Sequence, residues 1–283
     1  MGHVAIVTDS ASDLTPELAA SAGITVVPLI VSFGATSFRA GLDLTTEQFW
    51  ERMLALDAPF PTTAAAAPGA FVEAFQARFA AGAEAVVSVN VAGTLSGTIK
   101  SAEIARDMIK DREILIVDSR TASMGVGLLA LVGAELAAMG VSAAEIARVL
   151  ADRAGDIDLY VALDTLEYLK KGGRISGARA AIGGLLSIKP IITVREGLVE
   201  TADKVRTRGK ARERVIELLT RKPVERLAVL YTPPAEPEAF RDEVVAAMPG
   251  GIDPSRVTVQ PVGASVGPHL GPGCLGGVVL YRR

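Results

Sequence analysis

The chain has 283 residues, 32 acidic and 29 basic side chains, and a formal net charge of −3. This length favours two domains or one large α/β unit, and the missing basic excess argues against a general nucleic-acid-binding protein. One cysteine and two histidines exclude an intrachain disulfide framework and leave no zinc-ligand spacing, so no metal site is predicted.

The N-terminal segment is not typical of a secretory signal. The residues before Asp9 lack a basic region and form only a short apolar run. The longest apolar run, residues 124–134, is far shorter than the roughly 20 residues that a membrane-spanning helix needs. We therefore expect a cytoplasmic protein without a transmembrane segment.

Apolar, β-branched runs in the first half of the chain alternate with amphipathic segments, which is the pattern of a parallel sheet with crossover helices. The runs predict strands at 4–8, 24–33, 85–91 and 114–117. Helices are predicted at 16–22, 46–55, 69–80, 96–110, 122–139 and 143–153. The alanine-rich segment 62–68 is predicted to be a loop that ends where Pro68 begins a helix.

The second half of the chain has more strands and fewer helices. Strands are predicted at 159–163, 189–194, 198–205, 227–231, 257–262 and 275–281, with a hairpin turn at 195–197. Helices are predicted at 165–171, 177–186, 207–221 and 237–248. We therefore predict an α/β protein of two domains: residues 1–156 with a doubly wound, mostly parallel sheet, and residues 157–283 with a mixed or antiparallel sheet.

Residues 263–277 place six glycines and two prolines around His269. Glycine permits close backbone approach and positive φ, and proline fixes φ, so this composition predicts a shaped loop that holds the histidine in place. The alternative is a structural turn before the last strand.

Polar clusters follow three of the strands predicted in the first half, at residues 8–10, 93–98 and 118–120. In doubly wound sheets the ligand lies outside the carboxyl ends of the strands, so these loops are expected to share one binding edge. Ser96 is predicted to open a helix whose free N–H groups at Gly97 and Thr98 would bind a carboxylate or a phosphate. The alternative is that Ser96 only caps the helix.

Six motifs occur along the chain in a fixed order: VTDSASDL, LSGTIKSA, VDSRTASMG, LEYLKKGGRIS, KPIITV and GPHLGPG. Together they resemble the DegV family over essentially the whole chain. The resemblance implies a long-chain fatty acid bound between two α/β domains, with no other cofactor. It also implies a protein that presents the carboxylate to a separate fatty-acid kinase, which forms the acyl phosphate, and that contacts the membrane transiently to exchange lipid.

The resemblance also assigns roles to individual residues. Thr63, Ser96 and His269 match the positions that hold the fatty-acid carboxylate. Arg174 matches an arginine linked to phosphotransfer, and Arg206 falls at a basic position associated with kinase engagement. The chain departs from the family pattern at residues 64–67, which are all alanine where polar residues are more usual.

Two other functions use the same residues. Ser96 as nucleophile and His269 as base would suit a serine acyl hydrolase or transferase, although the sequence lacks the G-x-S-x-G turn of such enzymes. A regulatory protein that senses a lipid would share the pocket of the carrier. In each case the apolar segment 124–138 is expected either to line the lipid tail or to form ordinary core.

Overall fold

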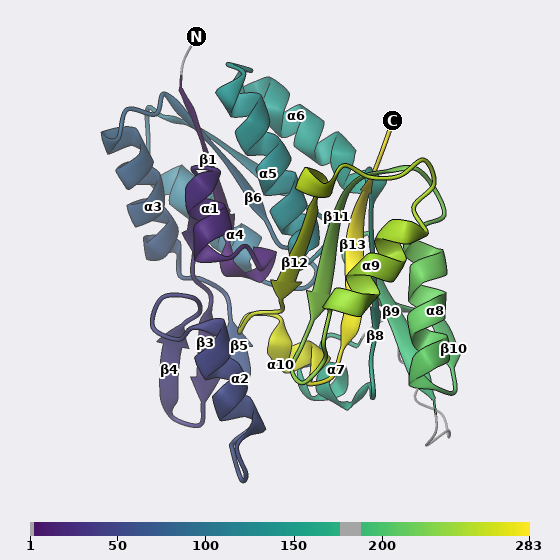
Figure 1. Cartoon of the computed structure of the whole chain (residues 1–283). Coiled ribbons are helices and arrows are strands. Elements are labelled where there is room, and N and C mark those ends of the chain that lie inside the picture. Colours follow the sequence, from purple (N-terminus) through teal and green to yellow (C-terminus); the bar gives the residue numbers. More distant parts are fainter. Residues whose placement is uncertain (1–2, 176–187) are drawn as a thin grey trace.

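The computed structural model of the chain describes residues 3–175 and 188–283, so the helix predicted at 177–186 lies outside the described residues (Figure 1). Its first half contains a four-stranded sheet in the order β2-β1-β6-β7, and every neighbouring pair is parallel. The strands are β1 (Val4–Asp9), β2 (Thr25–Val27), β6 (Ala85–Asn90) and β7 (Glu113–Asp118). The predicted parallel sheet is confirmed.

Helices cover both faces of this sheet. They are α1 (Pro16–Ser21), α3 (Pro68–Ala80), α4 (Thr98–Met108), α5 (Met124–Ala138) and α6 (Ala143–Arg153). Helix α2 (Thr46–Leu54) instead packs against Val31 and Phe33, outside this sheet. Successive side chains of a strand point to opposite faces. Accordingly Ala5 and Val7 of β1 pack with the α3 and α4 side, whereas Val4 and Ile6 pack with the α5 and α6 side. The doubly wound arrangement follows from this alternation.

A small antiparallel sheet in the order β4-β3-β5 was not predicted. It consists of β3 (Ile30–Phe33), β4 (Thr36–Arg39) and β5 (Thr62–Ala64). The single strand predicted at 24–33 is wrong because the chain leaves the parallel sheet at Pro28, which has no N–H to donate to a ladder. The loop predicted at 62–68 is also partly wrong, since Thr63 pairs with Val31 as part of the edge strand β5.

The second half forms a six-stranded mixed sheet in the order β10-β9-β8-β13-β11-β12. The strands are β8 (Ile157–Ala162), β9 (Lys189–Arg195), β10 (Leu198–Val205), β11 (Val224–Tyr231), β12 (Val257–Pro261) and β13 (Leu275–Tyr281). Only the β11–β12 pair is parallel, so the predicted mixed sheet is confirmed.

The helices of this half are α7 (Glu167–Lys171), α8 (Arg208–Leu219), α9 (Glu238–Ala246) and α10 (Gly267–Leu270). Helices α8 and α9 cover one face of the six-stranded sheet through a separate apolar cluster (Figure 1). Helix α10 lies inside the glycine-rich segment, so the prediction of a continuous loop is wrong there. Pro268 fits the first turn of this short helix because that turn needs no N–H from it.

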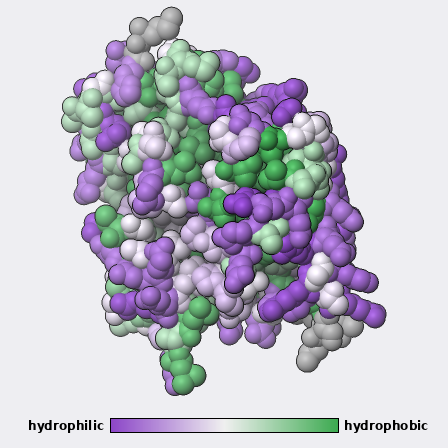
Figure 2. Space-filling view, viewed as in Figure 1, coloured by the Kyte–Doolittle hydropathy of each residue, from purple (hydrophilic) through white to green (hydrophobic). Residues whose placement is uncertain are grey.

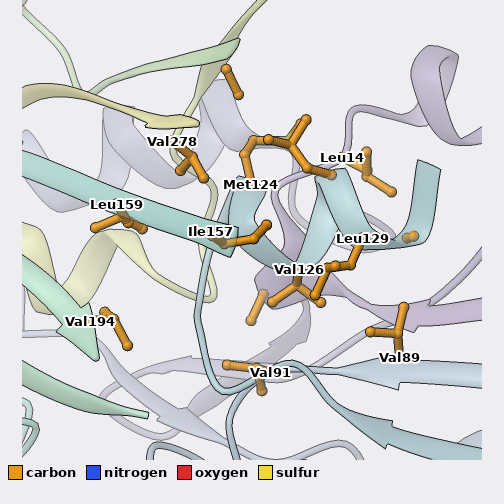
Figure 3. Close-up of a cluster of buried hydrophobic side chains, with 14 of the residues drawn as sticks. Leu14, Val89, Val91, Met124, Val126, Leu129, Ile157, Leu159, Val194 and Val278 are labelled. Carbon is orange, nitrogen blue, oxygen red and sulfur yellow. The ribbon is translucent and has the colours of Figure 1, made fainter. Parts of the chain in front are cut away.

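Helix α5 packs between the two large sheets. It contacts β1 and β6 on one side and β8, β11 and β13 on the other. Figure 3 shows Val126 and Leu129 of α5 within one buried cluster that also contains Val89, Ile157 and Leu159. One core therefore runs through both halves, and the division into domains 1–156 and 157–283 stays a prediction.

The apolar character of α5 is explained by this position, because a helix buried on both sides needs no polar face. It has 15 residues. No helix in the described part of the chain combines the length and the apolar character that a bilayer crossing requires.

Candidate functional site

A cavity lies between the carboxyl ends of the parallel strands and the face of the six-stranded sheet that points towards α5. It contains about 840 Å³ of empty space, a figure that includes the solvent at its mouth. Ala11, Val91 and Ala122 line it just beyond the ends of β1, β6 and β7. Of the three polar clusters predicted to share a binding edge, only 93–98 contributes lining residues, at 95–97; beside the clusters 8–10 and 118–120, the neighbouring residues Ala11 and Ala122 line the cavity instead.

The cavity is polar at one end and apolar inside. Four partly buried polar residues line it: Thr63, Ser96, Arg174 and His269. Ala64 and Gly97, next to two of them, are exposed and mark the open end. The inner wall is fully buried and comes from β8, β9, β10 and β11: Leu159, Val161, Ile192, Val194, Val199 and Leu230. Such a shape suits an amphiphile whose polar head stays near solvent.

Thr63 and His269 meet across 206 positions of sequence, with Thr63 Oγ1 hydrogen-bonded to His269 Nε2 at 3.1 Å. Strand β5 fixes Thr63, because pairing with β3 sets the side to which its hydroxyl points. Helix α10 fixes His269, and Gly267 packs so closely that a Cβ there would lie 2.6 Å from the Phe49 ring. The edge strand and the short helix, both missed in the sequence, thus create this contact.

The imidazole of His269 is held in its neutral form. Burial, helped by the positive charge of Arg174, lowers the pKa of His269 to about 4. The backbone of Gly172 lies directly beside the ring, since a Cβ on this glycine would come within 2.1 Å of Nδ1. Within the described residues, Nδ1 has no hydrogen-bond partner. Gly172 is therefore a site residue that the sequence did not reveal, although it lies in the G-G-R-I-S motif.

Ser96 lies just before α4 and does not open it. The helix begins at Thr98 with Gly97 at the N-cap, because the Ser96 N–H is bonded to the Ala92 carbonyl in a preceding turn. The predicted helix start is therefore wrong by two residues. Ser96 Oγ accepts the Thr98 N–H at 3.3 Å and lies 2.8 Å from Thr98 Oγ1. Ser96 thus bonds to the first residue of the helix without being its N-cap, and it also lines the cavity.

Arg174 joins the Ser96 loop to the end of α7. Its Nε donates to the Leu95 carbonyl at 3.1 Å and its Nη1 donates to the Gly172 carbonyl at 2.7 Å. The guanidinium thus places a positive charge at the polar end of the cavity. Arg206, by contrast, is exposed and is not among the described residues that line this cavity.

The apolar side chains of α5 predicted as a possible tail lining belong to the core instead. Leu128 and Leu129 are buried between the sheets, and the residues that line the cavity here, Ala122 and Ser123, come just before the helix. Ser265, which the sequence did not single out, also lines the cavity, and its Oγ lies 2.7 Å from Ser10 Oγ.

The geometry does not assemble a hydrolase triad. Ser96 Oγ pairs with Thr98, whereas His269 pairs with Thr63. Asp9 is occupied by the Val91 and Ala11 backbone N–H groups and by the Asn90 amide. Among the described residues, no carboxylate is hydrogen-bonded to His269, so nothing orients the imidazole as a base for Ser96.

Comparisons with known proteins point to one family along almost the whole chain. The family model described as an uncharacterised protein of the DegV family matches residues 3–282. The chain belongs to the DegV family. A DegV domain-containing protein of Deinococcus radiodurans is 37% identical to it over 277 residues, which cover 96% of both chains.

Solved structures of DegV-family proteins share this architecture, and the predicted α/β fold is confirmed. A fatty-acid-binding DegV-family protein from Thermus thermophilus matches with a TM-score of 0.89 and 33% identity over 100% of both chains. A stearic-acid-binding protein from Eubacterium ventriosum matches with a TM-score of 0.89 and 27% identity, over 99% of this chain and 98% of that chain.

The buried histidine predicts a pH-dependent stability. Because the pKa of His269 falls from 6.5 to about 4 on folding, its contribution to stability is complete above pH 6.5 and is lost as the pH falls towards 4. Relative to His269→Gln, the wild type should lose on the order of 2 kcal/mol between pH 7.5 and 4.5. Urea denaturation of both proteins across this range measures the difference.

Asp9 and Asp13 do not disturb this comparison. Burial raises their pKa values to about 6 and about 7, so their effect on stability has the opposite sign, but it is present in both proteins. His3→Gln, a change at the other histidine, should follow the wild-type curve. If the free energy of unfolding depended on pH in the same way for wild type and His269→Gln, the imidazole could not be neutral and desolvated.

Proposed function

We propose that this DegV-family protein binds a long-chain fatty acid in the cavity, with the carboxylate near Thr63, Ser96 and His269. The observation that carries the proposal is a single cavity with one open polar end and a buried apolar wall. The fatty-acid-binding function of the Thermus and Eubacterium proteins supports it, since this chain shares their fold from end to end.

Most of the affinity comes from the tail. A chain of sixteen carbons has about 14 methylenes, and burying them at ~0.8 kcal/mol each is worth on the order of 11 kcal/mol before the cost of binding is subtracted. A hydrogen bond to the charged carboxylate adds roughly 1.5–3 kcal/mol. The head-group residues therefore mainly set which end of the ligand lies at the mouth.

The charge at the head group comes from Arg174. His269 is neutral near pH 7, so it would not form an ion pair with the carboxylate. The Thr63 hydroxyl already holds its Nε2 atom, which fixes the ring in the cavity. Residues 64–67 offer only backbone groups and methyls here, so recognition of the head depends on few side chains.

We propose that the protein is a carrier that presents the carboxylate to a separate fatty-acid kinase in the cytoplasm, and not an enzyme itself. The lack of a triad around Ser96 and His269 in the described residues supports this over the hydrolase alternative. Arg174 at the head group would assist phosphotransfer. Arg206, exposed and outside the cavity, would contact the kinase.

The loop after α2 suits a transient membrane contact. Figure 2 shows a hydrophobic protrusion at the lower end of the molecule, below α2. Leu54 and Leu56 in this region are 49% and 93% exposed. The loop leads to β5, and on the way the Phe60 ring lies 5.6 Å from the Lys171 ammonium. Exposed leucines and a nearby cation would favour an anionic lipid surface.

Fatty-acid uptake tests the proposed binding. We expect protein incubated with palmitate in phospholipid vesicles to show one bound fatty acid in native mass spectra. Ser96→Ala should weaken binding by roughly tenfold, because it removes one hydrogen bond to the carboxylate, whereas the exposed control Ser21→Ala should bind as the wild type does. A wild-type mass without lipid at saturating palmitate would overturn the proposal.

The same vesicles test the membrane contact. The double variant Leu54→Glu/Leu56→Glu should take up palmitate more slowly from vesicles while reaching the same bound amount, because the cavity is intact. If the double variant took up palmitate at the wild-type rate, the proposed membrane contact through Leu54 and Leu56 would be contradicted.

Kinase coupling tests the role assigned to Arg206. With a fatty-acid kinase and ATP, the loaded protein should yield acyl phosphate, and Arg206→Glu should lower the rate several-fold by reversing a partner-facing charge. Lys222→Glu, the same change in charge after α8, serves as the control. Equal rates for Arg206→Glu and wild type, with normal fatty-acid binding, would refute the assignment.

A further inference from the structure

The β9–β10 hairpin forms one wall of the cavity, and its turn lies against the loop that carries Ser96. Ile192, Val194 and Val199 from the two strands line the cavity. Beyond them, the turn at Glu196 and Gly197 reaches the first half of the chain. One hairpin therefore touches both the tail region and the head-group loop.

Three polar contacts fasten the turn. Thr94 Oγ1 donates to the Gly197 carbonyl at 2.6 Å, and the Gly197 N–H donates to the Arg120 carbonyl at 2.9 Å. The Arg120 guanidinium pairs with the Glu196 carboxylate at 3.0 Å, but Glu196 is 72% exposed. A surface ion pair contributes little, so the two hydrogen bonds to Gly197 are the main attachment.

The fit at this turn is close. Gly197 has a φ of +75°, and a Cβ there would lie 2.2 Å from Thr94 Oγ1. Glycine is thus needed twice, for the conformation of the turn and for the approach of Thr94. The sequence predicted the turn at 195–197, but not its contacts with Thr94 and Arg120.

Most other polar attachments of the hairpin lie at its base, away from the turn. There, β9 pairs with β8 at Ile191 and Ile192, and the Leu163 N–H donates to the Pro190 carbonyl. Ion pairs join Lys189 to Asp164 and Asp203 to Arg214 of α8. Strand β10 is at the edge of the sheet. The two strands of the hairpin pair with each other along most of their length. The hairpin is therefore a unit that the turn contacts hold at its far end.

The Ser96 loop depends on the same contact. The N–H groups of Leu95 and Ser96 both bond to the Ala92 carbonyl, and the Leu95 carbonyl accepts from Arg174. Thr94, two residues before Ser96, ties this compact turn to the hairpin.

We infer that Thr94 and Gly197 are positioning residues that hold the β9–β10 hairpin closed over the acyl chain and so set how fast the fatty acid is released. The inference rests on the proposed fatty-acid binding. Outward movement of Val194 and Val199 would free the tail, and the attachment at Gly197 resists that movement at the turn end of the hairpin.

Release kinetics test this role. A fluorescent long-chain fatty acid is bound to the protein, and its loss to excess vesicles is followed by stopped flow. Thr94→Val keeps the shape of the side chain but removes the hydroxyl, and should speed release roughly five- to tenfold, the effect of one lost hydrogen bond. Thr94→Ser should restore the slow rate. Thr36→Val, the same change on the exposed strand β4, is the control.

Hydrogen exchange of the unloaded protein gives a readout that needs no ligand. In Thr94→Val the Gly197 amide should exchange faster, while amides in β8 and β13 keep wild-type protection. Wild-type release and exchange rates in Thr94→Val, or fast release in Thr94→Ser, would overturn the inference. If the wild type takes up no fatty acid, the proposed function fails, and the exchange rates still decide whether Thr94 holds the hairpin.

Discussion

Helix α5 is buried on both sides, and its packing sets the distance and orientation of the two large sheets. Val126 and Leu129 lie in the same apolar cluster as residues of β6 and β8. The helix begins at Met124, so the space between the sheets is filled along α5 and is open just before it. The cavity lies there, with Ala122 and Ser123 at its border. The packing of α5 thus holds the two sheets apart, and the cavity lies between them just before the helix begins.

A buried carboxylate links the start of α5 to the segment that carries His269. Asp13 accepts a hydrogen bond from Ser123 Oγ at 2.5 Å and another from the Gly263 N–H at 2.9 Å. Burial raises the pKa of Asp13 to about 7, which reflects the cost of a desolvated charge. The two hydrogen bonds offset part of this cost, and they join the start of α5 to the segment that carries His269.

Much of the fold was predictable because the strands of the two large sheets are mostly apolar, β-branched runs in the sequence. The β-branched runs gave the parallel strands, and the hairpin at 195–197 was visible from its Arg-Glu-Gly turn. The small β4-β3-β5 sheet was not, because Thr36–Arg39 is short and mostly exposed, with no apolar alternation to mark it. Motif resemblance, and not periodicity, led to Thr63 and His269.

Contacts between distant residues could not be predicted. The Thr63–His269 hydrogen bond depends on β5 and α10, which are both too short to leave a pattern. Gly172 looks like any glycine after a helix until the ring of His269 is placed beside it. The docking of Gly197 on Thr94 likewise appears only when the two halves are packed together.

The orientation of a bound acyl chain is the most direct test of the assigned site. A crystal structure with 16-bromopalmitate locates the tail by the anomalous signal of bromine. We predict bromine in the apolar interior near Val194, Val199 or Leu230, and the carboxylate beside Ser96 and His269. Bromine at the mouth near Ala64 and Gly97, or outside this cavity, would contradict the assignment of the head and tail ends.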